Sequence, residues 1–467
     1  MKVGKDRAEE IRVTYIGGGS KEWAWKFMID LALEESLHGT MTLYDIDRPA
    51  AEENAIVGNQ ITARLESRGK WHYQVGDSLE ASLEGADFVI ISILPGTFDE
   101  MESDVHLPER LDIWQSVGDT AGPGGMVRAL RTIPMYVEIA EAIRKVCPDA
   151  WVLNYTNPMS LCVKTLYQVF PEIKAFGCCH EVFGTQEMLA RMCREVLGEA
   201  DISREDILVN VMGINHFTWF TECVCRGQDL FGTYARFIDE HEGEGFDDPA
   251  ASWMDSPFHG AHLVKFDLFR RFHAIAAAGD RHLAEFMPGD SYLKDPMTVN
   301  SWKFGLTSVD FRRAQQVSKL ARRKRFVRGE EQPELKPSGE EGVQLMKALA
   351  GLSRVVSNAN LPNRGQIANL PVGAIVETNA VFSADSVKPV MAGEMPEAIR
   401  ELTMPHVENH ELILQAALTC DRELVVEAFL HDPLVKAKCT DRETIAQLVD
   451  DMLWNTRNYL PKQWFQA

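Results

Sequence analysis

Short β-branched or apolar runs alternate with helical patterns from about Ile11 to Gly184. The run DFVIISI (87–93) is almost wholly apolar, which is typical of a parallel strand with both faces covered. Parallel strands need a crossover between them, and a helix supplies it. The alternation therefore predicts an α/β fold with a Rossmann-like, doubly wound parallel sheet. Beyond the strand that begins at Ile11, the expected strands are 41–47, 71–75, 87–93, 151–155 and 173–177.

The pattern changes after Leu208. Residues 208–227 have the β-branched and aromatic content of strands, and we expect a turn between them at Gly213. Helical patterns dominate from about Phe231 to the end, with one extended stretch at 361–382. A chain of 467 residues is too long for one ordinary core. We therefore expect a Rossmann-like domain over 1–207 and an α+β, mostly helical domain over 208–467.

The net charge of −21 argues against a nucleic-acid or anionic-membrane partner, because long-range repulsion would oppose both. One charged segment, 319–342, begins with a basic run. This run could be a nucleic-acid patch, but the overall acidity of the chain favours a solvated helix or a subunit contact. No apolar run is long enough to span a membrane, and MKVGKDRAEE is not a secretory signal. Nine cysteines without a disulfide-scaffold spacing suit the reducing cytoplasm.

A glycine-rich stretch lies where the first strand must turn into a helix. Glycine allows the backbone to approach a pyrophosphate, and the helix N-terminus supplies N–H donors. The next strand ends in Asp45, whose carboxylate can accept a hydrogen bond from a ribose hydroxyl. This order predicts an NAD site made of Gly17, Gly18, Gly19, Ser20 and Asp45.

The glycine pattern departs from the usual dinucleotide fingerprint in one place. Glu22 stands where G-x-G-x-x-G has its third glycine. Arg48 lies close to Asp45 in sequence and keeps NADP open as an alternative, because an arginine can accommodate a 2′-phosphate.

Polar clusters follow several of the expected strands. They are NYTNP (154–158), CHE (179–181) and GINH (213–216), and GDRHLAEFMPGD (279–290) adds Asp280, Arg281, His282 and Glu285. Open α/β sheets bind ligands at the carboxyl ends of their strands, so we expect these clusters to converge beside the cofactor. A Cys thiolate with an imidazole suits a first-row transition ion. The alternative is that the cysteine is a small core residue, which is how cysteines after buried strands usually serve.

Taken together in this order, GGGS, SVGDTAGPGG, NYTNP, CCHEVFG and GINH resemble glycoside hydrolase family 4. The similarity runs from Ile11 to near the C-terminus and includes NLPVGAIVE (369–377). Members of this family are NAD-dependent and stand apart from two-carboxylate glycosidases. The tetrad CHEV (179–182) is the form associated with α-galacturonidases.

The resemblance implies roles for individual residues. Cys179 and His216 would hold a divalent ion, most often manganese, and Asn157 would bind the sugar near O2 and O3. The base that removes the C2 proton comes from the second half of family members, and Asp280 is our candidate by position. Glu181 or Asp119 could serve as the general acid, although Asp119 and Thr120 could instead only shape their glycine-rich loop.

The implied reaction is hydrolysis of α-D-galacturonides derived from pectin. NAD takes hydride from C3, the metal stabilises the enediolate formed when the C2 proton leaves, the aglycone is eliminated, and water adds before the hydride returns. The expected partner is a small sugar, and the resemblance implies a homodimer or homotetramer. A galacturonate carboxylate needs a cation nearby. The candidates are Arg281, Arg128, Arg131, His180 and His282, with His180 and Glu181 facing the glycone, while Cys178 is expected to pack in the core.

Three other interpretations stay open at this stage. An α-glucuronidase or α-galactosidase would use the same mechanism. A lactate- or malate-type dehydrogenase has a similar first domain and also carries Asn-Pro after the corresponding strand, but it normally continues with Asp, whereas Met159 and Ser160 follow here. A non-catalytic NAD-sensing module would not need Cys and His clusters at strand ends.

Overall fold

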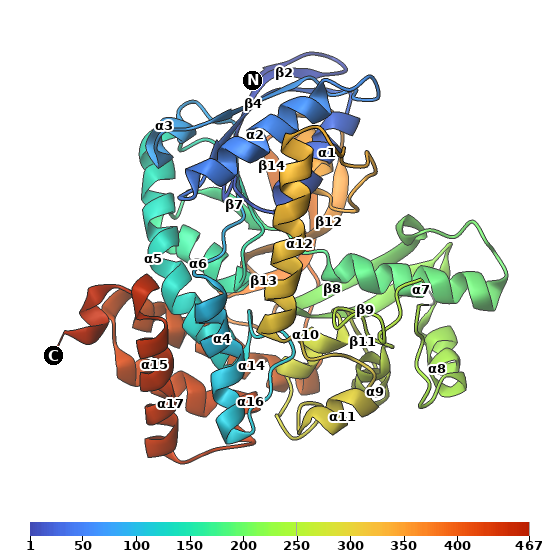
Figure 1. Ribbon diagram of the computed structural model, residues 1–467. Helices are drawn as coiled ribbons and strands as arrows, with labels where there is room; N and C mark the ends of the chain where they lie inside the picture. Colours follow the sequence, from blue (N-terminus) through green and yellow to red (C-terminus); the bar gives the residue numbers. More distant parts are fainter. Residues whose placement is uncertain (249, 467) are drawn as a thin grey trace.

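The computed structural model describes residues 1–248 and 250–466. Its larger sheet has ten strands, in the order β14-β13-β12-β7-β6-β5-β2-β3-β4 with β1 beside β2 (Figure 1). The strands from β7 to β4 are parallel to one another, which confirms the predicted Rossmann-like sheet. The strands are β1 (Lys2–Val3), β2 (Ala8–Ile16), β3 (Leu37–Tyr44), β4 (Trp71–Val75), β5 (Phe88–Ile91), β6 (Trp151–Asn154) and β7 (Lys174–Gly177), followed by β12 (Val355–Pro362), β13 (Ile375–Ser383) and β14 (Ser386–Pro389).

Helices cover both faces of this sheet, which explains why its central strands read as apolar runs. Phe88 and Ile90 of β5 pack toward one group of helices, and Val89 and Ile91 pack toward the other. The first group is α1 (Trp23–Leu33), α2 (Arg48–Thr62) and α13 (Gly342–Leu349). The second is α3 (Leu79–Leu83), α5 (Gly122–Val146) and α6 (Met159–Val169).

The extended stretch expected at 361–382 is a hairpin, β12–β13, that joins the edge of the same sheet. β12 pairs antiparallel with β7 through Asn360 and Gly177. The large sheet therefore contains strands from both halves of the chain, and the domain division at residue 207 stays a sequence-based prediction.

A smaller antiparallel sheet lies beside the first, at the right of Figure 1. The turn between its two long strands lies at Asn215–His216, so the expected turn at Gly213 was wrong: Gly213 pairs with Thr218 inside the ladder. Its strands are β8 (Ile207–Ile214), β9 (Phe217–Cys225), β10 (Gln228–Asp229) and β11 (Ile275–Ala276). The helices around it are α7 (Glu181–Leu197), α8 (Phe231–Glu240), α9 (Leu263–Phe272), α10 (Asp280–Glu285) and α11 (Pro296–Ser301).

The C-terminal part is helical, as expected. α14 (Glu397–Thr419) packs on α5 and α15, so this part shares a core with the middle of the chain. The remaining elements are α4 (Phe98–His106), α12 (Val309–Val327), α15 (Arg422–His431), α16 (Pro433–Lys436), α17 (Arg442–Asn455), η1 (Leu107–Leu111), η2 (Arg204–Asp206), η3 (Arg457–Tyr459) and η4 (Lys462–Phe465).

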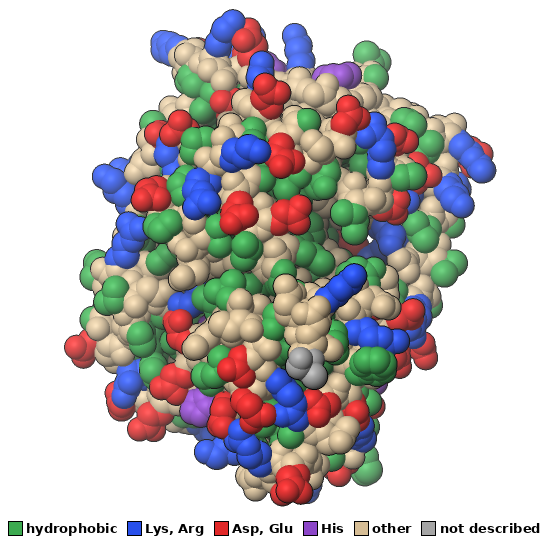
Figure 2. All heavy atoms as spheres, turned by 90° about the vertical axis from the view of Figure 1, so that its left-hand side faces the viewer, with side chains coloured by type: hydrophobic (Ala, Val, Ile, Leu, Met, Phe, Trp, Pro, Cys, Tyr) green, Lys and Arg blue, Asp and Glu red, His purple; other side chains and the backbone are tan. Residues whose placement is uncertain are grey.

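The basic run that begins at Lys319 belongs to α12, a long helix that contacts α2 and α4 (Figure 1). Its cations are largely paired within the chain: Lys319 contacts Glu22, Arg323 lies 2.6 Å from Glu53, and Arg322 lies 2.8 Å from Glu331. Charges of both signs are interspersed on the face in Figure 2. These pairings favour the interpretation as a structural helix over a nucleic-acid patch. Among the helices of the described residues, none has the length and apolarity that crossing a bilayer requires.

Candidate active site

The glycine-rich turn lies at the carboxyl end of β2, in close contact with neighbouring backbone. Gly17 has a φ of +92°, and a Cβ there would lie 2.0 Å from the carbonyl oxygen of Ser92. A Cβ on Gly18 would lie 2.7 Å from Cβ of Leu43. Only glycine fits these positions, so the turn presents bare backbone, as a pyrophosphate site requires.

Asp45 supports this turn directly. Its Oδ2 accepts a hydrogen bond from the Gly19 N–H at 2.8 Å, and the Asn54 amide donates to the carbonyl oxygens of Gly18 and Ser20. Glu22, at the place of the missing third glycine, precedes the first residue of α1 and pairs with Lys319. The residues present therefore form a cradle that fits a dinucleotide, with Asp45 at the end of β3 where the ribose is expected.

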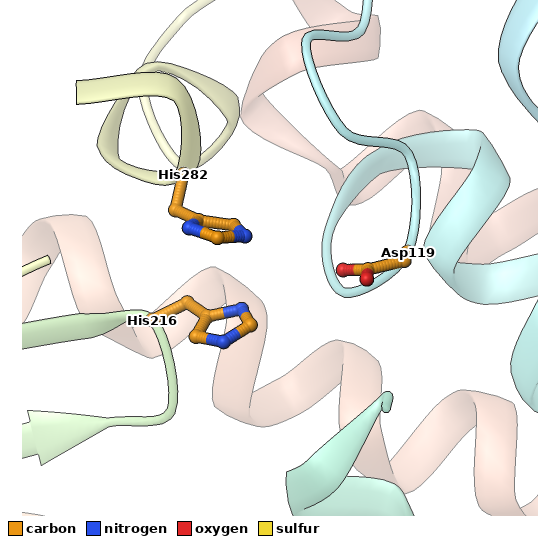
Figure 3. A group of neighbouring side chains, drawn as sticks. All are labelled: Asp119, His216 and His282. Atoms are coloured by element: carbon orange, nitrogen blue, oxygen red, sulfur yellow. The ribbon is translucent and has the colours of Figure 1, made fainter. Parts of the chain in front are cut away.

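Three ligand-type side chains meet beyond the sheet. Atoms of Asp119, His216 and His282 all lie within 4.8 Å of one another (Figure 3). They come from the loop before α5, the β8–β9 turn and α10. Asp119 and His282 are half-buried, so the cluster is open on one side. Carboxylate and imidazole ligands with an open side suit a divalent ion that also binds substrate.

Thr120 sets the tautomer of His216. Its hydroxyl donates to Oδ1 of Asp119 at 2.7 Å, so it must accept from Nδ1 of His216, 2.9 Å away. The lone pair of His216 is then on Nε2, the form that binds metal. Burial, and the nearby His282, lower the pKa of His216 to about 3, so the imidazole is neutral at physiological pH.

The pKa values of the other two members of the cluster are shifted in favour of their charged forms. Burial disfavours the charged form of His282, but Glu181, 3.3 Å from its Nδ1, outweighs this effect and raises the pKa. Burial likewise opposes ionisation of Asp119, but Arg128 and the two histidines hold the pKa of this carboxyl well below its usual value. The cluster thus combines a neutral imidazole, a carboxylate and a Glu181–His282 pair.

Cys179 lies in the β7–α7 loop and is buried. It is not one of the three clustered residues, but its thiol lies near the side chain of Asn215, the residue before His216. Burial and the Glu377 carboxylate raise the pKa of this thiol well above its usual value, and a bound cation would favour the thiolate instead. Its role as a metal ligand stays a prediction. Cys178 packs against the sheet core, as expected.

Asn157 lies at the edge of the cluster, 3.5 Å from Asp119 through its amide nitrogen. Glu181 also faces the cluster through His282, and its second oxygen accepts from the Gly279 N–H. His180, in contrast, is turned toward Trp23 and Glu340, with its Nδ1 3.3 Å from the Glu340 carboxylate. This placement does not support a contact between His180 and the glycone in the described conformation.

Asp280 does not face the cluster. Its carboxylate accepts hydrogen bonds from the backbone N–H groups of Val264 and Lys265 at the start of α9, and it lies 3.9 Å from the buried Lys265 ammonium. This is a structural arrangement that satisfies a helix N-terminus. The geometry therefore corrects our choice of Asp280 as the base. Sequence position alone could not reveal this, because Asp280 and His282 are neighbours on a short helix that point to different sides.

Two residues near the cluster were not singled out from the sequence. Glu377 of β13 accepts from the Asn358 amide and lies 3.4 Å from the Asn215 amide, and burial raises its pKa to about 7. Arg312 of α12 lies within electrostatic range of Asp119. The sequence places His282 in a converging polar cluster and among the partners for a sugar carboxylate but not among the metal ligands, whereas the structure places it in the ligand cluster itself. The sequence feature that could have indicated His282 as a cluster member is its place in the polar segment 279–290, beside Arg281 and near Glu285.

The strand order and the glycine-rich turn define a Rossmann-like α/β protein, with a cluster of metal-ligand-type side chains that come from two loops and a short helix. Residues 12–195 match the family 4 glycosyl hydrolases, and residues 211–435 match the C-terminal domain of the same family. The chain therefore belongs to family 4 of the glycosyl hydrolases. This assignment sets aside the dehydrogenase and the NAD-sensing interpretations.

Individual relatives agree with this. The chain is 59% identical to an α-galacturonidase of Lachnoclostridium phytofermentans, over 99% of this chain and 100% of that protein. It superposes on the crystal structure of lplD from Bacillus subtilis with a TM-score of 0.91 at 49% identity, covering 96% of this chain and 100% of the other. A 6-phospho-α-glucosidase from gut microorganisms, solved with NAD and Mn²⁺, shares the fold with a TM-score of 0.79 at 20% identity, covering 97% and 99%.

Proposed function

We propose that the chain hydrolyses α-D-galacturonides with the help of NAD and a divalent ion, most suitably manganese. The observation that carries this proposal is the Asp119–His216–His282 cluster, which has the Asn157 amide 3.5 Å from Asp119 and lies in the same fold as the glycine-rich turn. The 59% identity with an α-galacturonidase over the whole length supports the choice of substrate.

NAD and the divalent ion would supply reversible oxidation at C3 of the sugar and polarisation of the neighbouring sugar oxygens. The chain supplies the rest. Gly17, Gly18, Gly19, Ser20 and Asp45 would hold NAD, and Asp119, His216 and His282 would surround the ion, with Cys179 as a further expected ligand.

The protein's part in proton transfer falls to groups that face the cluster. Glu181 is hydrogen-bonded to the backbone and paired with His282, so the two can share a proton across 3.3 Å. Asp119 is held ionised by Arg128, which suits it to orient the sugar hydroxyls beside Asn157. Glu181, with Asp119 as the alternative, remains our proposed general acid, and the geometry does not favour Asp280 as the base.

The sugar is the expected small-molecule partner, and we propose a homodimer or homotetramer in the cytoplasm. All nine cysteines are free thiols, including Cys162, Cys179, Cys193, Cys223 and Cys225 in the interior. Free thiols in such number suit a reducing compartment. An α-glucuronidase or α-galactosidase acting by the same mechanism is the alternative.

The decisive experiment measures release of sugar from an aryl α-galacturonide and from digalacturonate in D₂O, with and without NAD and manganese, under reducing conditions. We expect release only with both cofactors, deuterium at C2 of the product and no net NADH. Stoichiometric NADH would contradict the proposal and point to a dehydrogenase. Release from glucuronides or galactosides but not from galacturonides would keep the mechanism and change the substrate.

A further inference from the structure

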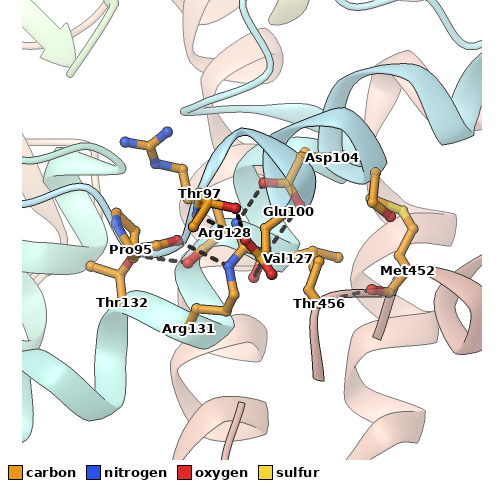
Figure 4. Close-up of polar contacts among 12 residues, drawn as sticks. Pro95, Thr97, Glu100, Asp104, Val127, Arg128, Arg131, Thr132, Met452 and Thr456 are labelled. Atoms are coloured by element: carbon orange, nitrogen blue, oxygen red, sulfur yellow. Dashed lines mark hydrogen bonds and ion pairs between the residues drawn. The ribbon is translucent and has the colours of Figure 1, made fainter. Parts of the chain in front are cut away.

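Of the cations that the sequence offered for a uronate carboxylate, two already have other partners. Arg131 forms a buried, two-pronged pair with Asp104, with Nη1 3.0 Å and Nη2 2.5 Å from its carboxylate oxygens (Figure 4). This pair fixes α5 to α4 and leaves Arg131 no free donor fork. His180 faces Glu340, as described above.

Arg128 and His282 are tied to the ligand cluster. Nε of Arg128 donates to the carbonyl oxygen of Asn157 at 3.0 Å, and its charge acts chiefly on Asp119. His282 pairs with Glu181. Both groups are therefore already engaged at the cluster that would hold the ion.

Arg281 remains, and the fold brings Arg312 next to it. Their guanidinium carbons lie 5.2 Å and 5.9 Å from the centre of the Phe258 ring, which is 40% exposed. One Nη of Arg281 donates to Ser116 O and to Thr307, which fixes the side chain, while its buried Nε has no partner.

Within the described part of the chain, the Arg312 guanidinium makes neither a hydrogen bond nor an ion pair, and its Nε is buried. The neighbouring carboxylates do not serve as its counter-ion. Glu285 is directed to the backbone N–H groups of Val117 and Gly118, and Asp119 is committed to Thr120 and the histidine cluster. A largely buried guanidinium without a counter-ion is unfavourable, so this position is suited to an anion that arrives with the substrate.

Helix geometry strengthens this expectation. Arg312 lies in the first turn of α12, just after the cap residue Ser308, where the partial positive charge of the helix N-terminus already favours an anion. A hollow of about 540 Å³ borders the same segment, and its lining includes Pro257 and Leu306, the neighbours of Phe258 and Thr307. The hollow is lined by chain neighbours of Phe258 and Thr307 and not by the two arginines themselves.

We propose that Arg312, supported by Arg281, binds the C6 carboxylate of the substrate and makes the enzyme selective for uronides over neutral hexosides. This inference rests on the proposed function and assigns its substrate selectivity to specific side chains. The sugar would lie between the Asp119–His216–His282 cluster, which faces its O2 and O3 side, and the two guanidinium groups, which face C6. Arginine suits this role because its planar fork matches a carboxylate.

The test compares Arg312→Met with Arg313→Met as the matched control. Arg313 is the next residue of the same helix and is half-buried, with partners Asp99 and Glu102. The substrates are an aryl α-D-galacturonide and its C6 methyl ester, which differ in charge but keep the same ring. The quantity measured is the ratio of kcat/KM for the acid to kcat/KM for the ester.

We expect Arg312→Met to lower this ratio by about 10- to 100-fold, the usual effect of removing a hydrogen bond to a charged group. Arg313→Met should leave the ratio unchanged, and Arg312→Lys should retain part of the preference because it keeps the charge without the fork. Equal losses on acid and ester would show that Arg312 acts only on the structure, and this would overturn the proposal. Kinetics unchanged from wild type on both substrates would overturn the proposal as well.

Equilibrium binding of free galacturonate and galactose, measured by calorimetry on the cofactor-loaded protein, gives a second readout. Arg312→Met should weaken galacturonate selectively. If the wild-type protein releases no sugar from galacturonides, the proposed function fails, but the binding preference still decides the carboxylate site. If Arg312→Met does not fold, as judged by NAD binding, Arg312→Gln and Arg312→Lys carry the same comparison.

Discussion

The rings of His216 and His282 are stacked, with centroids 4.0 Å apart and planes inclined by 29°. One comes from the tight turn between β8 and β9, where His216 has a φ of +64°, and the other from α10. The pKa values of the two rings are shifted in opposite directions. Burial lowers the pKa of His216, whereas Glu181 raises the pKa of His282 despite burial. The opposite shifts lessen like-charge repulsion between the two adjacent imidazoles, and His216 keeps the lone pair of Nε2 for a metal.

His216→Ala should reduce turnover of an aryl α-galacturonide by at least about 100-fold, the effect typical of losing a group at a metal site. It should also weaken manganese binding, which is measured by titration with the metal under exclusion of other divalent ions. His72→Ala is the control, because His72 is exposed on β4. Unchanged metal affinity in His216→Ala would remove this residue from the ligand set.

Gly17→Ala should abolish detectable NAD binding. The new Cβ would meet the backbone of Ser92 at 2.0 Å, and the φ of +92° is strained for any residue with a side chain. Gly184→Ala in α7 is the matched control, since a Cβ there meets nothing within 4 Å, and alanine in a helix should stabilise by up to about 1 kcal/mol. Fluorescence titration with NADH measures both, and equal affinities in the two variants would contradict the assigned site.

Asp280→Asn should lower the melting temperature but keep kcat within about tenfold of wild type. The substitution leaves the buried Lys265 ammonium without its counter-ion, and breaking a buried ion pair costs about 3 kcal/mol or more. Asp290→Asn, which removes an exposed carboxylate nearby, should change neither quantity. A loss of kcat beyond about 100-fold in a folded Asp280→Asn protein would restore Asp280 as the base.

The pH dependence of stability should carry the signature of Asp432. Its carboxyl caps α16, and burial raises its pKa to about 7. A folded-state pKa above the unfolded value of about 3.9 means that the folded state holds the proton longer, so stability falls as pH rises between these values and then levels off. Compared with Asp432→Asn, which cannot ionise, the wild type should lose stability from pH 5 to about 7 and little beyond.

Thermal unfolding of both proteins across this range measures the difference. Asp421→Asn, at the exposed cap of α15, is the control and should track the wild type. A difference between wild type and Asp432→Asn that does not vary with pH would contradict the prediction.

The sequence by itself determined the local parts of this protein. Apolar runs such as 87–93 could only be buried strands, because an uncovered face would expose them to water. Gly17 and Gly18 marked the tight turn, since backbone conformation and close approach depend on the residue itself. The motifs around Asn157, Cys179 and His216 stood at strand or turn ends and pointed to the family, which the comparisons confirm.

Only the tertiary structure decided which side chains face one another. Asp280 and His282 are two residues apart, yet one caps α9 and the other joins the cluster, because a helix directs such neighbours to different sides. The hairpin β12–β13 joins the first sheet from residues far along the chain and brings Glu377 near Asn215. Arg312 reaches Phe258 and Arg281 only through the packing of α12. Such contacts depend on long-range packing, which no local pattern of residues encodes.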